Sequence, residues 1–203
     1  PELPVPFTRK FYLADTHLNH ELMLDPNGCA RPFSSVREMD QFIEDMWNST
    51  VGTHDIVYHL GDVAFKLVEQ AERLKALFAR LKGRKFLVPG NHDMDKHGNL
   101  HPTIASLGWE VPPSAIMETT DEGERLVLCH YALRTWPGIR KGAWHFYGHS
   151  HGDLPGVGRS RDVGIDCPDM GYAPRTFQEL TAGMRDIPVH VEEEELAART
   201  MGM

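Results

Sequence analysis

The sequence predicts an α/β fold in which two stacked β-sheets are flanked by helices. In the first half of the chain, short apolar runs alternate with helical periodicities, and in the second half the pattern is mostly extended. A chain of 203 residues with 41% hydrophobic residues is long and apolar enough to bury the core of such a fold. Because no internal repeat or low-complexity linker interrupts the pattern, we expect residues 1–203 to form a single domain.

The first half predicts three strands and two helices. In chain order these are strand 10–15, helix 34–47, strand 55–62, helix 66–82 and strand 85–93, the last running into a loop. The first helix begins with a capping box formed by Ser35 and Glu38. Gly83 supplies the stop signal of the second helix. In this second helix the apolar positions recur every three or four residues and predict one buried stripe, made of Val68, Ala71, Leu74, Phe78 and Leu81.

Turn signals divide the second half into further short elements. Strands are expected over 114–120, 124–132, 143–151 and 161–167, followed by a short helix or turn over 176–184. The acidic tail 191–203 reads as a solvated or fraying helix.

Composition excludes several classes of protein. No apolar run approaches the roughly 20 residues of a membrane span, and the first residues lack the pattern of a signal peptide. Three widely spaced cysteines predict neither a disulfide framework nor a structural zinc site, so a cytoplasmic location is expected. The net charge of -8 opposes broad attraction to nucleic acid, and we expect no stable nucleic-acid or membrane partner. The oligomeric state is left open.

Metal-competent side chains follow one predicted strand after another. Sites in open α/β sheets gather beyond the carboxyl ends of strands, where loops converge on a rigid sheet. One pocket is therefore expected to contain Asp15, His17, Asp62, Asn91, His130, His149 and His151. The glycines Gly61, Gly90 and Gly148 each stand directly before one of these residues or pairs, which indicates close backbone approach.

These residue types suit transition-metal ions. Carboxylate, carboxamide and imidazole donors favour Mn(II), Fe, Zn or Ni. Seven ligands are too many for one catalytic ion, and they fit two ions that share a bridging carboxylate. His149 and His151 lie one residue apart, as they would in an accidental polar turn. The alternative is that residues i and i+2 at a strand end point to the same side and converge on the metals.

The motifs resemble the calcineurin-like metallophosphoesterase signature, and the compact phage and bacterial members in particular. The signature reads D-x-H, G-D, G-N-H-[D/E], a lone H, and G-H-x-H. This chain has all five in order, as Asp15-x-His17, Gly61-Asp62, Gly90-Asn91-His92-Asp93, His130 and Gly148-His149-x-His151. Such a resemblance implies a four-layer sandwich, with two mixed β-sheets inside and helices outside.

The resemblance also implies roles for individual residues. One ion would be held by Asp15, His17, Asp62 and His151, and the other by Asp62, Asn91, His130 and His149. Asp62 would bridge two divalent ions, with manganese the first expectation. His92 would be catalytic, since it contacts the phosphate and protonates the leaving oxygen after attack by a metal-bridging hydroxide.

Other residues carry weaker expectations, each beside a structural alternative. Asn91 and His92 are candidates for substrate binding, as are His20 and Arg31, which otherwise read as ordinary surface residues. Asp93 either orients His92 or caps a turn, and Asp166 either supports the site or the fold. His59 is expected to be a hydrogen-bonded core histidine. The candidates for aromatic walls of the substrate site are Trp136 and Tyr172.

The expected activity is hydrolysis of P–O ester bonds, leaning to small-molecule phosphodiesters. The short chain and the G-N-H-D form resemble small-molecule phosphodiesterases more than protein phosphatases. Phosphomonoesters, including nucleotides, remain open as substrates. A nuclease is the alternative enzyme, although the acidic charge counts against it. A non-catalytic adaptor is the alternative from another class, although adaptors on this fold typically lose ligands, whereas all seven are kept here.

Overall fold

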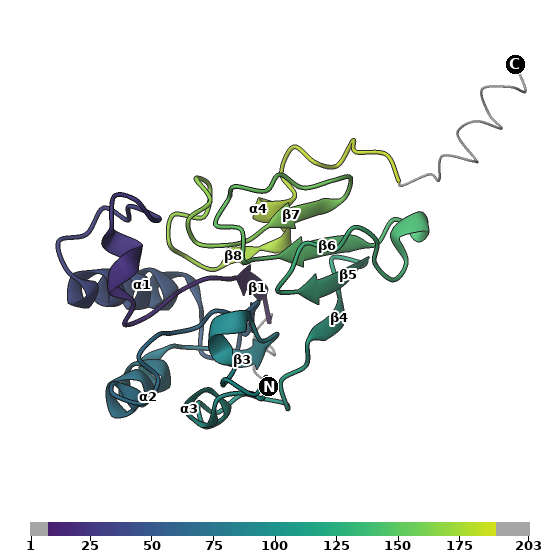
Figure 1. The fold of residues 1–203 in the computed structure, drawn as a ribbon. Helices are drawn as coiled ribbons and strands as arrows, with labels where there is room; N and C mark the ends of the chain where they lie inside the picture. The colour runs from purple at the N-terminus through teal and green to yellow at the C-terminus, as the bar shows by residue number, and fades with distance from the viewer. Residues whose placement is uncertain (1–7, 190–203) are drawn as a thin grey trace, which may run out of the picture.

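The computed structural model describes residues 8–189, which build two four-stranded mixed sheets (Figure 1). The first sheet has the order β3-β2-β1-β8, where β8 alone is antiparallel; its strands are β1 (Lys10–Leu13), β2 (Ile56–His59), β3 (Arg84–Leu87) and β8 (Arg175–Thr176). The second sheet has the order β4-β5-β6-β7, where β4 alone is antiparallel; its strands are β4 (Ile116–Asp121), β5 (Glu124–Cys129), β6 (Trp144–Tyr147) and β7 (Ser160–Asp162).

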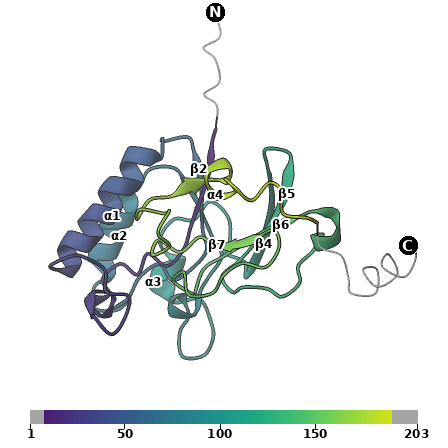
Figure 2. The ribbon, with the colours of Figure 1, turned by 90° about the horizontal axis from the view of Figure 1, so that it is seen from above.

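Helices complete the α/β architecture. Figure 2 shows α1 (Val36–Thr50) and α2 (Ala71–Arg80) on one side of the molecule and the second sheet on the other. The shorter helices are η1 (Glu21–Leu24), η2 (Asn91–Asp93), α3 (Pro102–Ala105), η3 (Ile139–Lys141) and α4 (Phe177–Leu180). Val127 of β5 packs with Trp136 and Ala143 in a small cluster separate from the main core. The predicted class, two mixed sheets with flanking helices, is confirmed.

Helix α1 begins where the capping box predicts. The Ser35 side chain accepts a hydrogen bond from the Glu38 backbone N–H at 3.2 Å, and the Glu38 carboxylate accepts from Ser34 rather than from Ser35. The prediction for α2 was wrong at its start, because the helix begins at Ala71 and Val68 is 73% exposed in the preceding turn. No helix among residues 8–189 is long and apolar enough to span a membrane. The predicted C-terminal helix lies outside the described residues.

The main core fills the space between the two sheets and continues beneath α1 and α2. The Tyr12 ring of β1 stacks on Tyr58 of β2 at 5.5 Å and meets Phe146 of β6 edge-on at 5.3 Å. Burying an aromatic side chain of this size contributes about 1.5–3 kcal/mol. The contact therefore ties the inner faces of both sheets together and fixes how their strand ends are aligned.

The two sheets join at the carboxyl end of β1. Ala14 donates its N–H to Val163 O at 2.9 Å and accepts from Ile165 N–H at 3.1 Å, which connects the end of β1 to the segment directly after β7. Gly148, directly after β6, lies so close that a Cβ there would be 2.4 Å from the Ala14 Cβ. This close approach brings the loops that follow β1 and β6 into one region.

Replacing Gly148 by alanine is expected to lower the free energy of unfolding by about 1–3 kcal/mol, the usual cost of overpacking a tight interior. Urea denaturation measures the change. Gly108→Ala is the control, because a Cβ there meets nothing within 4 Å and only the left-handed φ of 76° opposes it. Equal losses in both variants would contradict a steric requirement at Gly148.

Candidate metal centre

The seven predicted ligands gather in the loops that follow five strands. Asp15 and His17 follow β1, and Asp62 and Asn91 follow β2 and β3. The histidines of the second sheet, His130, His149 and His151, follow β5 and β6. Four groups among the described residues have ligand atoms that all lie within 4.8 Å of one another, and two of them consist of predicted ligands alone, namely Asp15 with His17 and His151, and Asp62 with His130 and His149. The other two are His17 with Asp62 and His92, and Cys29 with His151 and Asp166.

The Asp62 carboxylate stands between the two groups. Its Oδ2 is 3.5 Å from Nε2 of His17 and 3.6 Å from Nε2 of His130. Its Oδ1 accepts the backbone N–H of His92 at 2.9 Å, which fixes the plane of the carboxylate. Asn91 Oδ1 lies 3.2 Å from the same His130 nitrogen. One carboxylate oxygen can therefore serve both groups at once, which is the placement that a bridging ligand requires.

His149 and His151 belong to different groups. The His149 ring lies 5.1 Å from that of His130, and the His151 ring lies 5.1 Å from that of His17. Strand alternation does not explain this, because β6 ends at Tyr147. Both histidines instead have left-handed backbone, with φ of 69° and 50°. The expectation of one histidine for each ion is matched in placement, but the loop conformation produces it.

Left-handed backbone extends through the rest of the cluster. Asp15, His17 and Asp62 have φ of 59°, 45° and 55°. Non-glycine residues rarely occupy this region, and each such position costs about 1 kcal/mol or more. Strain concentrated on proposed ligands indicates that the loops are shaped for the site rather than for stability.

The donor atoms are prepared for a cation. The Nε2 of His17 is buried and has no hydrogen-bond partner, although a buried polar nitrogen normally has one. Burial lowers the pKa of His17, which keeps the ring neutral with its lone pair free. In His130, Nδ1 donates to Leu60 O at 2.7 Å, so Nε2 is left as the ligand atom. Carboxylate, imidazole and amide oxygen together fit the divalent ions expected from the sequence.

The orientation of His151 is set by Asp166. The Asp166 Oδ2 accepts from His151 Nδ1 at 2.7 Å, which directs Nε2 toward Asp15 and His17. Burial disfavours the charged ring, but the bonds to Asp166 and to the Cys29 sulfur, at 3.4 Å, raise the pKa of His151 to about 10. The negative charge that stabilises a proton on this ring also favours a bound cation.

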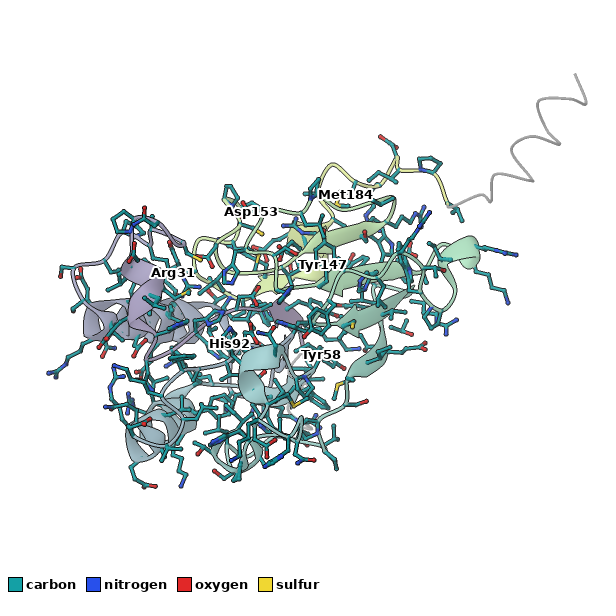
Figure 3. The ribbon with its side chains drawn as sticks, viewed as in Figure 1. Arg31, Tyr58, His92, Tyr147, Asp153 and Met184 are labelled. Atoms are coloured by element: carbon teal, nitrogen blue, oxygen red, sulfur yellow. The ribbon has the colours of Figure 1, made fainter. Side chains whose placement is uncertain are left out.

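Arg31 lies behind the site, and its side chain is fully buried. The guanidinium donates twice to the Asp166 carboxylate, at 2.7 Å each, and to the carbonyl oxygens of Asp15 at 2.7 Å and Thr16 at 2.9 Å. The expectation that Arg31 lines the phosphate pocket is therefore corrected, because its charge faces protein rather than substrate. Arg31 joins the ligand loop after β1 to the residue that orients His151 (Figure 3).

Asp93 joins two further loops. Its buried carboxylate accepts backbone N–H groups from Gly90 at 2.8 Å and from Asp62 and Val63 at 2.9 Å. Burial raises the pKa of Asp93 to about 7, while the three N–H donors favour the ionised form. Asp93 was expected to orient His92 or to cap a following turn, but its carboxylate instead caps the start of η2 at Gly90 and binds the loop after β2.

His92 stands at one edge of the site. Its ring is half-buried, 5.1 Å from the His17 ring and 5.6 Å from the Phe65 ring. His20 is 5% exposed, stacks on Phe65 at 4.0 Å, and has its Nδ1 3.1 Å from Nδ1 of His17. Burial lowers the pKa of His20 to about 4, so the ring is neutral at pH 7. His20 therefore contacts the proposed ligand His17 and packs against its ring.

The aromatic residues beside the site differ from those expected. Trp136 is 6% exposed and packs in the small outer cluster, and Tyr172 packs edge-on against Phe33 at 5.3 Å. Phe65 and Tyr131 flank the site instead, with Tyr131 47% exposed and 4.8 Å from the His149 ring. Their positions in the chain, just after Asp62 and His130, were the available signal.

His59 supports the turns that carry the ligands. Thr16 Oγ1 donates to Val63 O and lies 2.9 Å from His59 Nε2, so it accepts from that nitrogen. His59 Nδ1 accepts the N–H of Gly61 at 3.2 Å. The expected hydrogen-bonded core histidine is confirmed. Burial lowers the pKa of His59 to about 3, and the nearby His130 acts in the same direction.

The pKa of His59 is below its unfolded value of 6.5, so protonation favours the unfolded chain. The free energy of unfolding of the metal-free protein should therefore fall by about 1.4 kcal/mol for each pH unit below 6.5, until the pH reaches about 3. Urea denaturation of the wild type and of His59→Gln between pH 7 and 5 measures the slopes. The wild-type slope should be steeper by that amount, and parallel slopes would exclude the linkage.

Asp166→Asn removes the charge that faces His151 while keeping the side-chain shape. We expect the affinity of one of the two metal equivalents to fall about 10–100-fold, while the other equivalent is retained. Calorimetric titration of metal-free protein with Mn(II) resolves the two. Asp169→Asn is the control, because the Asp169 side chain is 58% exposed and pairs with Arg161 outside both ligand groups. Unchanged affinity in Asp166→Asn would show that Asp166 supports the fold alone.

Comparison with known proteins identifies the family. The calcineurin-like phosphoesterase model matches residues 11–163. An uncharacterized protein of Methanocaldococcus jannaschii is 41% identical over 172 residues, 82% of this chain and 86% of that protein. The gene 66 protein of Mycobacterium phage L5 is 29% identical over 83 residues, 41% of this chain and 39% of that protein.

The fold also has a counterpart among solved structures. A protein of unknown function from Aquifex aeolicus superposes with a TM-score of 0.63 at 21% identity, covering 87% of this chain and 99% of that one. At this identity the likeness concerns the fold alone. With the family match spanning all seven proposed ligands, the chain belongs to the calcineurin-like phosphoesterase family.

Proposed function

We propose that the protein is a dinuclear metal-dependent hydrolase of small-molecule phosphodiesters. The single observation that carries the proposal is the Asp62 carboxylate oxygen, placed 3.5 Å and 3.6 Å from histidines of two separate ligand groups. Two divalent ions bound there would lower the pKa of a shared water and neutralise phosphoryl oxygens. Manganese is the first candidate, with Fe, Zn and Ni as alternatives.

The side chains divide the remaining tasks. Asp15, His17 and His151 hold one ion and Asn91, His130 and His149 hold the other, while Asp62 belongs to both. His92, half-buried at the edge of the cluster, is not one of the seven proposed ligands and can deliver a proton to the departing oxygen. The Asn91 amide also reaches the substrate side, because Asn91 is exposed.

The lean toward diesters is supported by Arg31. A monoester brings two negative charges to the site and a diester brings one. The arginine expected to meet that charge is fully buried and donates both to Asp166 and to two backbone carbonyls. A substrate with a single charge is therefore better matched. The net charge of -8 weighs against a nuclease, and the complete ligand set weighs against an adaptor.

Hydrolysis of bis(p-nitrophenyl) phosphate and of p-nitrophenyl phosphate tests the proposal. Metal-free protein is reloaded separately with Mn, Fe, Ni and Zn. We expect metal-dependent turnover that favours the diester, and Asn91→Ala should lower kcat/KM by about 100-fold or more because a ligand is lost. His92→Ala should lower kcat by about 10²–10⁴-fold with metal content unchanged.

His97→Ala is the matched control, since His97 is an exposed histidine outside both ligand groups and should leave kcat/KM unchanged. Preference for the monoester would sink the diester assignment while keeping the enzyme. Two ions bound with no turnover on either ester would favour the adaptor.

A further inference from the structure

An open groove of about 290 Å³ lies on the second sheet, among the loops that follow β5 and β6. Two loops form it, and each begins at a proposed ligand. Residues 132–134 follow His130, and residues 154–157 follow His151. The complete lining is Ala132, Leu133, Arg134, Tyr147, Leu154, Pro155, Val157 and Ser160. Tyr147 and Asp153 are labelled in Figure 3. They stand at the two ends of the segment that contains the ligand histidines His149 and His151 and that leads to Leu154 of the lining.

The groove is mostly apolar although it is open to solvent. Leu154 is 48% exposed and Val157 is 76% exposed, two of the few large apolar side chains that residues 8–189 leave this accessible. The Leu154 backbone is held in place, because the hydroxyl of the buried Tyr147 donates to Leu154 O at 2.8 Å. An exposed apolar surface in a shaped hollow is typical of a binding site.

Tyr131 connects the groove to the metal centre. It directly precedes the lining residue Ala132, and its ring lies 4.9 Å from His130 and 4.8 Å from His149. Both histidines belong to the group around Asp62. An organic group attached to a phosphoryl group at that centre therefore meets Tyr131 first and the groove next.

The two sides of the centre differ. His92, the proposed proton donor, lies on the other side with His17, His20 and Phe65 around it. The departing oxygen must be on that side to receive its proton. A diester has one further arm, which stays on the product, and the groove in the loop that follows Tyr131 is an apolar surface on the Tyr131 side of the cluster.

We propose that this groove, which we call the arm groove, binds the retained organic arm of the phosphodiester and selects an aromatic or bulky apolar arm. The inference rests on the proposed function and adds the substrate class to it. A cavity of roughly 150 Å³ already holds a benzene ring, so the arm groove has room for a phenyl-sized or larger group. Arg134 is exposed at its wall and offers donors to acceptor atoms on that arm.

Two synthetic diesters with the same leaving group isolate the retained arm. Phenyl p-nitrophenyl phosphate and methyl p-nitrophenyl phosphate both release p-nitrophenolate, and they differ in the group that stays. We expect kcat/KM of the metal-loaded protein to be about tenfold higher for the phenyl ester, from burial of the ring. Leu154→Asp should bring the ratio close to one while leaving kcat/KM for the methyl ester within about twofold.

Val111→Asp is the control, because Val111 is 40% exposed against 48% for Leu154 and lies in the connection between β3 and β4. It should keep the wild-type ratio. A wild-type ratio near one, or a raised ratio that survives in Leu154→Asp, overturns the arm groove. Hydrolysis of the methyl ester in either case leaves the proposed function standing.

A binding measurement separates failure of the groove from failure of catalysis. Methylphosphonate and phenylphosphonate are not hydrolysed, so calorimetry on the metal-loaded protein compares the arm alone. We expect phenylphosphonate to bind about tenfold more tightly, and Leu154→Asp to abolish the difference. Equal affinities in the wild type overturn the proposal even if neither diester is turned over.

Discussion

The structure depends on the close approach of its two sheets at the carboxyl end of β1. Ala14 is hydrogen-bonded to Val163 and Ile165, and a Cβ on Gly148 would overlap the Ala14 Cβ. The next residue on one strand is Asp15, and the next on the other is His149, whose N–H donates to the Asp15 carboxylate at 2.9 Å. Ligands from both sheets can face one another only because the backbones meet here.

Burying these charged and polar ligands together costs electrostatic free energy, which hydrogen bonds and ion pairs to neighbouring residues offset. Burial raises the pKa of Asp15, with the nearby Asp162 and Asp62 acting in the same direction. Arg31 and Asp166 clamp one side of the cluster, and Asp93 binds three backbone N–H groups on the other. The site is therefore preorganised, since residues outside the ligand set hold several of its ligands and ligand loops in position.

The fold was largely predictable because its signals are local. A capping box set the start of α1, and apolar runs located seven of the eight strands of residues 8–189, while the two-residue strand β8 was not predicted. The second helix was misplaced at its start because Val68 continued the apolar period into a turn. Order-dependent motifs identified the family, and the same motifs named the residues that the structure brings into two groups. The single-domain expectation for residues 1–203 stays a prediction.

Sequence alone determined which side chains gather, because each proposed ligand directly follows a strand and strand ends converge. It did not determine what those side chains face. Arg31 reads as a pocket residue in the chain, yet burial and Asp166 turn its charge inward. The flanking aromatics, Phe65 and Tyr131, and the groove beyond Tyr131 depend on loops with left-handed turns and distant packing partners. Such contacts join residues far apart in the chain, so only the tertiary structure decides them.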